Sequence, residues 1–97
     1  MPIWSEQPAS VVLSNWNIVE LDSGGDLTEH FIGYVDGDGY ARISTPIEER
    51  DTNDDGEIVG RTKSGSTYRL VGHAGLNSDG QYMYDVYFSK TEHKLLY

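Results

Sequence analysis

Apolar and polar residues alternate over short segments of this chain, and glycine-rich turns separate the segments. The first segment, residues 11–21, is rich in β-branched residues, and neither of its alternating faces is purely polar. We therefore expect a strand that is covered on both sides for part of its length. Paired glycines in Asp22–Asp26 are expected to end it, because glycine reaches positive φ at little cost.

The clearest predicted hairpin lies within residues 29–44. Its arms, residues 31–35 and 40–44, flank the sequence DGDG, and Asp-Gly dipeptides favour the tight turns of hairpins. The predicted cross-strand pairs are Ile32 with Ile43, Tyr34 with Ala41, and Val35 with Tyr40.

A second hairpin is predicted after an acidic loop at residues 48–57. Its arms, residues 58–63 and 67–71, would meet at a Ser64-Gly65 tip. The predicted pairs are Val59 with Leu70 and Arg61 with Tyr68, the latter with a cation–π contact.

The last third of the chain begins with a glycine-rich segment, Gly72–Gly80, which its composition marks as a loop. Residues 81–88 then alternate aromatic and other side chains, which predicts a final strand. Its two faces would be Tyr82, Tyr84, Val86 and Phe88, and Met83, Asp85 and Tyr87. Residues 90–97 are polar and then apolar, so this tail is expected to fray or to pack as a short turn.

These segments predict an all-β fold with little helix: one antiparallel sheet, curled or shaped as a small barrel or sandwich, and built from hairpins. The predicted organisation is an N-terminal arm at 1–10, a β domain at 11–90 and a tail at 91–97. The strands at residues 11–21 and 81–88 are candidates for exposed edges, which can pair with a partner or with a second copy in a homodimer.

The charge of the chain narrows the kinds of partner that it can bind. The 97 residues carry a net charge of −9, and residues 1–60 hold thirteen acids against two bases. Such a surface repels nucleic acid and anionic membranes and attracts basic partners. The chain has no cysteine, no segment long and apolar enough for a membrane helix, and no signal-peptide pattern, so we expect a soluble cytoplasmic protein.

The sequence DTNDDGEI, residues 51–58, resembles the calcium loop of the EF-hand and dockerin families. The resemblance assigns metal-ligand positions to Asp51, Asn53, Asp55 and, through its backbone carbonyl, Glu57. Gly56 matches the turn glycine, whereas Thr62 stands where a bidentate Glu belongs, and the flanks are β-like. Calcium binding or calcium stabilisation is therefore one hypothesis; the alternative is a solvated acidic turn, with no cofactor.

Catalytic patterns are sparse. The three histidines lack metal-ligand spacing, and neither a nucleophile elbow nor a phosphate-binding glycine loop is present. His73, in a glycine-rich loop with Asp79 nearby in sequence, is the best candidate for a general base, as in a small hydrolase. We expect a protein that is not an enzyme.

In size, acidity and lack of cysteine the chain resembles the small inhibitor proteins of phages and mobile elements, including anti-CRISPR proteins. That resemblance implies a nucleic-acid mimic that occupies the basic surface of a nucleic-acid-binding protein. The residues that would bind the partner are Glu48, Glu49, Asp51, Asp54, Asp55, Glu57, Asp36, Asp38 and the exposed Tyr87. The alternative is that the acids serve solubility alone.

Overall fold

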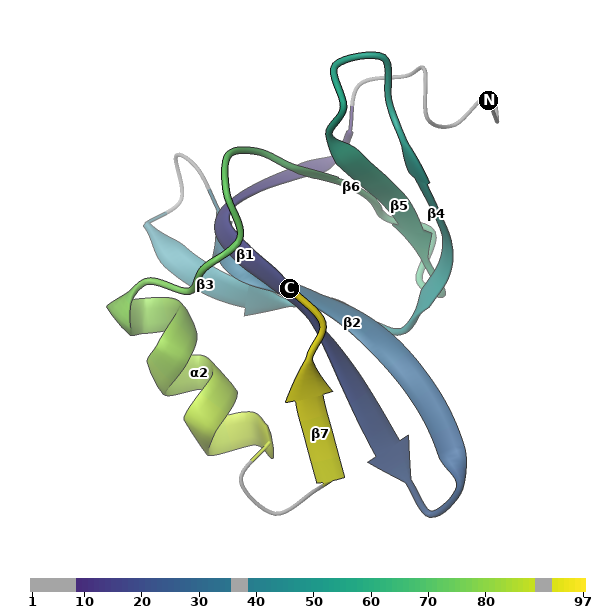
Figure 1. Cartoon of the computed structure of the whole chain (residues 1–97), viewed down its shortest axis with the longest axis vertical. Coiled ribbons are helices and arrows are strands. Elements are labelled where there is room, and N and C mark those ends of the chain that lie inside the picture. The colour runs from purple at the N-terminus through teal and green to yellow at the C-terminus, as the bar shows by residue number, and fades with distance from the viewer. Residues whose placement is uncertain (1–8, 36–38, 89–91) are drawn as a thin grey trace.

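The computed structural model describes residues 9–35, 39–88 and 92–97. In these ranges the elements are β1 (Val11–Ser23), β2 (Asp26–Val35), β3 (Tyr40–Ile43), β4 (Ile47–Thr52), β5 (Ile58–Thr62), β6 (Thr67–Leu70), α2 (Ser78–Phe88) and β7 (Glu92–Leu95). The strands form one sheet in the order β3-β2-β1-β6-β5-β4, and β7 also pairs with β1 (Figure 1). The β1–β6 pair is parallel and the others are antiparallel. The predicted all-β, antiparallel fold is confirmed as a curled sheet that does not close into a barrel.

The long strand β1 is the centre of this sheet. It pairs with β2 along one side, while its other side pairs first with β6 through Val11–Leu13 and then with β7 through Val19–Asp22. A bulge between Ser14 and Asn17 divides the strand, and Asn15 there has a φ of 46°. Gly33 lies across from this bulge, where a Cβ atom would come 3.1 Å from the backbone of β1. A side chain opposite the bulge would therefore be crowded, and Gly33 avoids that contact.

Two hydrophobic clusters use the two faces of β1 and β2. The larger lies inside the curl of the sheet and contains Val11, Leu13, Trp16, Ile18, Phe31, Val35, Tyr68 and Leu70. The smaller joins Val19 and Ile32 to Phe88 of α2 on the opposite face. The prediction that the first strand is covered on both sides is confirmed.

The helix α2 corrects the prediction of a strand at residues 81–88. Asn77 is its N-cap, since the Asn77 Oδ1 accepts the Gly80 N–H at 2.9 Å. Tyr84 and Phe88 lie four residues apart on one face of the helix and both contribute to the smaller cluster, which Leu76, just before the helix, also joins. Burying this stripe against β2 and β3 outweighs the β propensity of the aromatic residues.

The β5–β6 hairpin forms with a register one residue away from the predicted one. The pairs are Val59 with Arg69, Gly60 with Tyr68, and Arg61 with Thr67. The Thr62 N–H donates to the Ser66 carbonyl and the Gly65 N–H donates to the Thr62 carbonyl, so the loop has three residues rather than two. Gly65 has the positive φ, 89°, that such loops require. The predicted Arg61–Tyr68 pair is thus wrong, and Arg42 of β3 instead lies over the Tyr68 ring at 5.8 Å.

The remaining predictions are confirmed in some parts of the chain and wrong in others. The β2–β3 register is confirmed at its three predicted pairs, while the predicted turn residues 36–38 lie outside the described part. Part of the predicted acidic loop is the strand β4, and part of the predicted tail is β7, which pairs with β1. Neither predicted edge is one: residues 11–21 lie in the centre of the sheet, and 81–88 are helical. Residues 1–8 of the predicted arm are not described, and Ser10 hydrogen bonds to Thr67.

Candidate protein-binding surfaces

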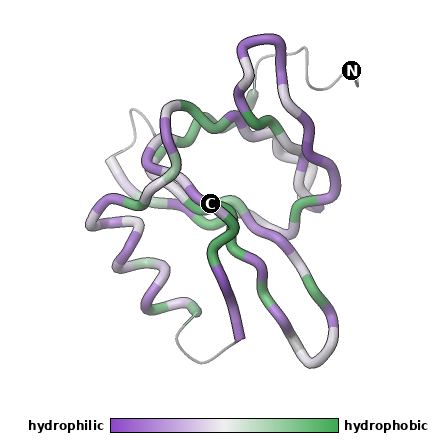
Figure 2. The backbone as a smooth tube through the Cα atoms, in the orientation of Figure 1, coloured by the Kyte–Doolittle hydropathy of each residue, from purple (hydrophilic) through white to green (hydrophobic). Residues whose placement is uncertain are grey.

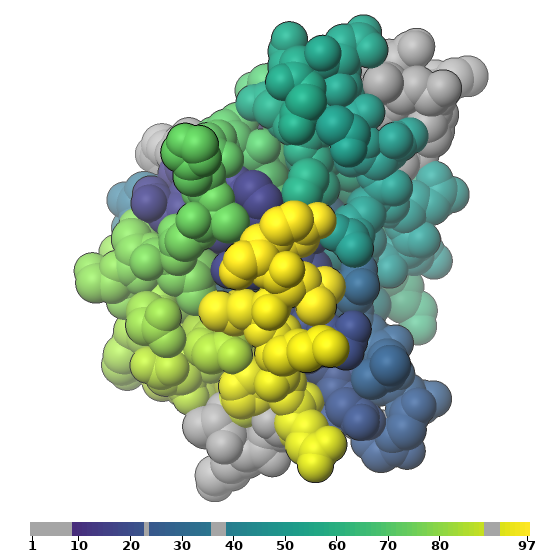
Figure 3. All heavy atoms as spheres, viewed as in Figure 1, coloured from purple at the N-terminus to yellow at the C-terminus, as the bar shows by residue number. Residues whose placement is uncertain are grey.

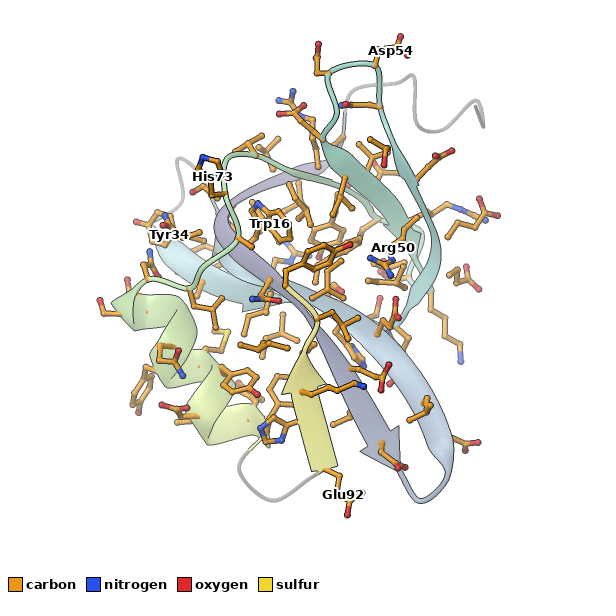
Figure 4. The ribbon with its side chains drawn as sticks, viewed as in Figure 1. Trp16, Tyr34, Arg50, Asp54, His73 and Glu92 are labelled. Atoms are coloured by element: carbon orange, nitrogen blue, oxygen red, sulfur yellow. The ribbon has the colours of Figure 1, made fainter. Side chains whose placement is uncertain are left out.

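The β4–β5 hairpin brings the predicted acidic residues of residues 48–57 together. It projects at one end of the molecule, far from α2, with a hydrophilic tip (Figures 1 and 2). Asp54 lies at that tip (Figure 4). Of the acidic side chains only Glu57 is half-buried; the exposed ones are Glu48, Glu49, Asp51, Asp54 and Asp55. In the space-filling view the atoms of the hairpin form the upper end of the molecule (Figure 3).

Two of these acids are neutralised within the hairpin sheet. Glu49 lies opposite Arg61 and forms an ion pair with it at 2.9 Å, and Glu57 pairs with Arg69 at 3.4 Å. These contacts lower the repulsion between carboxylates and hold β4, β5 and β6 together. Over the described ranges, no ion pair involves the remaining four acids, Glu48, Asp51, Asp54 and Asp55.

The turn of the hairpin is organised by Asn53. Its Oδ1 accepts the N–H groups of Asp55 and Glu57 at 3.0 and 2.9 Å, and its Nδ2 donates to the Glu57 Oε1 at 3.1 Å. These hydrogen bonds form an Asx turn that closes the loop. Within the described residues, no group of three or more acidic, histidine or cysteine side chains has the geometry to hold a metal. Calcium binding by Asp51, Asn53, Asp55 and Glu57 stays a prediction.

The other predicted contact residues lie apart from the hairpin. Tyr87 is 66% exposed on α2, and this helix lies on the opposite side of the molecule from β4 and β5 (Figure 1). Asp36 and Asp38 fall outside the described residues. The structure thus gathers six of the nine predicted partner-binding residues on one element and does not place Tyr87 with them.

A groove that the sequence did not indicate lies between β3 and α2, and we name it the β3–α2 groove. One hollow, of about 570 Å³, is lined by residues 40–44, by His30 and by Met83, Tyr87 and Phe88. A second, of about 400 Å³, shares Tyr40, Ala41 and Met83 with it and extends to Asp79 and Tyr82. Finding the groove required knowing that residues 78–88 are helical.

His30 forms part of the groove and is held in place by two hydrogen bonds. Its Nδ1 and the Ser44 carbonyl are 2.9 Å apart, and its Nε2 lies 2.9 Å from the Thr28 Oγ1. His73, by contrast, is exposed in the loop before α2 (Figure 4), and no hydrogen bond or ion pair in the described part of the chain involves it. A hydrolase that uses His73 stays a prediction without a described carboxylate partner.

Burial raises the pKa of the Tyr68 phenol above its ordinary value of 10.0, and the nearby Arg42 guanidinium opposes the shift. Burial, with a smaller contribution from Asp85, also raises the pKa of Tyr84. Both phenols therefore stay protonated near neutral pH, and their rings pack against Phe31 and Phe88 respectively.

Comparisons with known proteins give no family for this chain. No protein-family model matches it, and no curated protein or solved structure matches it either. Among the described residues no helix is long and apolar enough to cross a membrane. The case for a function therefore depends on the two surfaces, the acidic hairpin and the β3–α2 groove.

Proposed function

We propose that this chain is a non-enzymatic, cytoplasmic binding domain that docks its acidic β4–β5 hairpin onto the basic, nucleic-acid-binding surface of another protein. By occupying that surface the hairpin would exclude the nucleic acid, as in small acidic inhibitors of the anti-CRISPR type. The net charge of −9 argues against direct binding of nucleic acid to the chain itself.

The observation that supports the proposal is the set of exposed carboxylates that project from one ordered hairpin. Glu48, Asp51, Asp54 and Asp55 have no cationic partner in the described residues, so a basic surface could supply one. Docking would replace repulsion among like charges with attraction and would raise the association rate. The hairpin is ordered before contact by the β4–β5 and β5–β6 ladders, which reduces the entropy lost on binding.

The test is a triple charge reversal, Glu48→Lys, Asp54→Lys and Asp55→Lys. None of these three side chains makes a described hydrogen bond or ion pair, so the variant should fold as the parent does. Immobilised parent chain is expected to capture nucleic-acid-binding proteins from an extract of the source cell. The purified partner should bind the variant at least about tenfold more weakly, and added salt should weaken parent binding steeply.

The matched control is Asp26→Lys, Asp85→Lys and Glu92→Lys. It changes the net charge by the same amount, also at exposed positions, but away from the hairpin. The control should keep most of the binding. Equal loss in both variants would mean that net charge alone matters, and unchanged binding in the hairpin variant would contradict the proposal.

A further inference from the structure

The two edge strands of the sheet differ in how they meet solvent. The outer edge of β4 is protected by charged side chains, Glu48, Glu49, Arg50 and Asp51, which discourage pairing with another strand. At the other end β3, with the sequence YARI, has one charged residue and no strand on its outer side within the described ranges. The β3–α2 groove runs along this second edge.

The ladder shows which backbone groups of β3 face outward. The Ser44 N–H donates to the Phe31 carbonyl, so residue 44 is in a hydrogen-bonded position. In an antiparallel ladder such positions alternate, which places Arg42 and Tyr40 in hydrogen-bonded pairs with β2. The N–H and C=O groups of Ala41 and Ile43 therefore point toward the open edge.

The side chains beside these groups leave room for a ligand. Ile43 packs in the cluster that includes Phe88, so Ala41 and Ile43 face the helix side. The small Ala41 borders both hollows of the groove, and Tyr40, Tyr82 and Tyr87 are exposed around them. Side chains at alternate positions of an added strand would enter this largely apolar space, while its backbone bonded to the edge.

The charge of Asp79 predicts which end of a bound segment is basic. Asp79 lies at the end of the groove near Gly39, and Ser44 with Phe88 lies at the other end. An antiparallel ligand strand would have its C-terminal end beside Asp79. The acidity of the chain as a whole disfavours acidic ligands there as well.

We propose that the β3–α2 groove binds an extended segment of a partner protein, which adds as an antiparallel strand to β3. The segment presents apolar side chains at alternate positions to α2 and a lysine or arginine at the end next to Asp79. This site is separate from the acidic hairpin, so either proposal can fail without the other.

The experiment selects ligands from random nine-residue peptides displayed on phage, with the folded parent chain as the target. Enriched peptides should alternate apolar residues and carry a basic residue toward the C-terminal end. On titration with such a synthetic peptide, the NMR amide signals of Ala41 and Ile43 should shift most. Failure to enrich any such pattern, or shifts confined to another surface, overturns the proposal.

Ala41→Pro tests the edge itself. Proline removes an outward N–H without removing a β2–β3 hydrogen bond, and edge strands accept it at such positions. Peptide affinity should fall at least about tenfold, because the peptide loses one hydrogen bond to the edge and weakens its contacts beside it. The Ala41→Ser variant keeps the N–H and a small side chain. It should therefore bind the peptide with an affinity within about twofold of the parent's.

A second variant tests the groove without touching the sheet. Tyr87→Ala removes a 66% exposed side chain and should weaken the peptide about threefold or more, whereas Val86→Ala, exposed but outside the lining, should not. Equal affinities for these two variants would contradict the site. Light scattering that shows a parent dimer and an Ala41→Pro monomer would also overturn it, because a second copy would then occupy the edge.

Discussion

Gly60 lies where β5 crosses over the aromatic ring of Phe31 from β2. A Cβ atom at this position would lie 2.3 Å from the Phe31 Cζ and 2.8 Å from the Cε2, closer than atoms can approach. Phe31 is fully buried and also stacks obliquely against Tyr68, with ring centroids 5.2 Å apart. The glycine therefore lets the sheet curl tightly enough for β5 to cover the larger core.

Gly60→Ala should lower the free energy of unfolding by about 1–3 kcal/mol, the usual effect of forcing extra atoms into a packed core. Urea denaturation of the purified chain measures the loss. In a Phe31→Leu background the same change should cost clearly less, because leucine lacks the ring atoms that collide. Additive losses in this double-mutant cycle would show that the Phe31 ring is not the obstacle.

At the scale of elements, local turn chemistry predicted hairpins well and long-range packing decided the rest. The β2–β3 pairs follow from the alternation of apolar residues on both sides of the DGDG sequence. The β5–β6 register was missed because Ser64-Gly65 fits a two-residue turn as well as the three-residue loop that forms. Residues 78–88 carry both periods: alternate aromatics suit a strand, while Tyr84 and Phe88, four residues apart, suit a helix face.

The helix signal present in the sequence was the cap. Asn77-Ser78-Asp79 places an amide side chain before the first turn and an acid within it, both of which favour a helix start. These cues compete with the strong β propensity of the tyrosines that follow. Packing against the sheet decides between them, because Val19 of β1 and Ile32 of β2 are buried by Phe88 of the helix.

Asn77→Ala should destabilise the chain by about 1 kcal/mol, because the Gly80 N–H loses its acceptor at the start of α2. Asn77→Asp should retain nearly all of the stability, since the carboxylate accepts the same bond and also favours the helix N-terminus. Thermal denaturation followed by circular dichroism compares the three chains. An alanine variant as stable as the parent would mean that the cap contributes nothing.

At the scale of the whole molecule, the C-terminal segment completes the sheet. The Leu96 N–H donates to the Ile18 carbonyl, and the Tyr97 ring packs edge-on against Trp16 with centroids 5.3 Å apart. The Tyr97 hydroxyl also accepts a hydrogen bond from Arg50 of β4. The sequence predicts only a tail here, because a four-residue strand cannot be recognised before its partner, the second half of β1, is known.

The two candidate sites also differ in how far the sequence predicts them. The acids of the hairpin are neighbours in sequence, so their gathering on one element followed from the charge pattern alone. The β3–α2 groove joins residues 39–44 to residues 79–88, and no local pattern connects these segments. Their meeting depends on the helix and on the order of strands, which only the fold supplies.

Adjacent leucines test the role of the C-terminal segment. Leu96 packs against the larger core, whereas Leu95 is 36% exposed. Leu96→Ala should cost about 1–2 kcal/mol of unfolding free energy, as expected for a partly buried side chain, and Leu95→Ala less than about 0.5 kcal/mol. Chemical denaturation of both variants provides the comparison, and equal losses would mean that the segment does not close the core.

β1 carries one extra residue at its bulge. This residue changes which side chains in the second half of the strand face each side of the sheet. Because side chains change face at every step, Leu13 and Ile18 reach the same interior only through that additional residue. If residues 14–17 formed a regular ladder without the bulge, Ile18 would turn outward and Val19 inward, exchanging the contents of the two interiors. The bulge, with its positive φ at Asn15, is thus what lets both halves of β1 contribute to the same core.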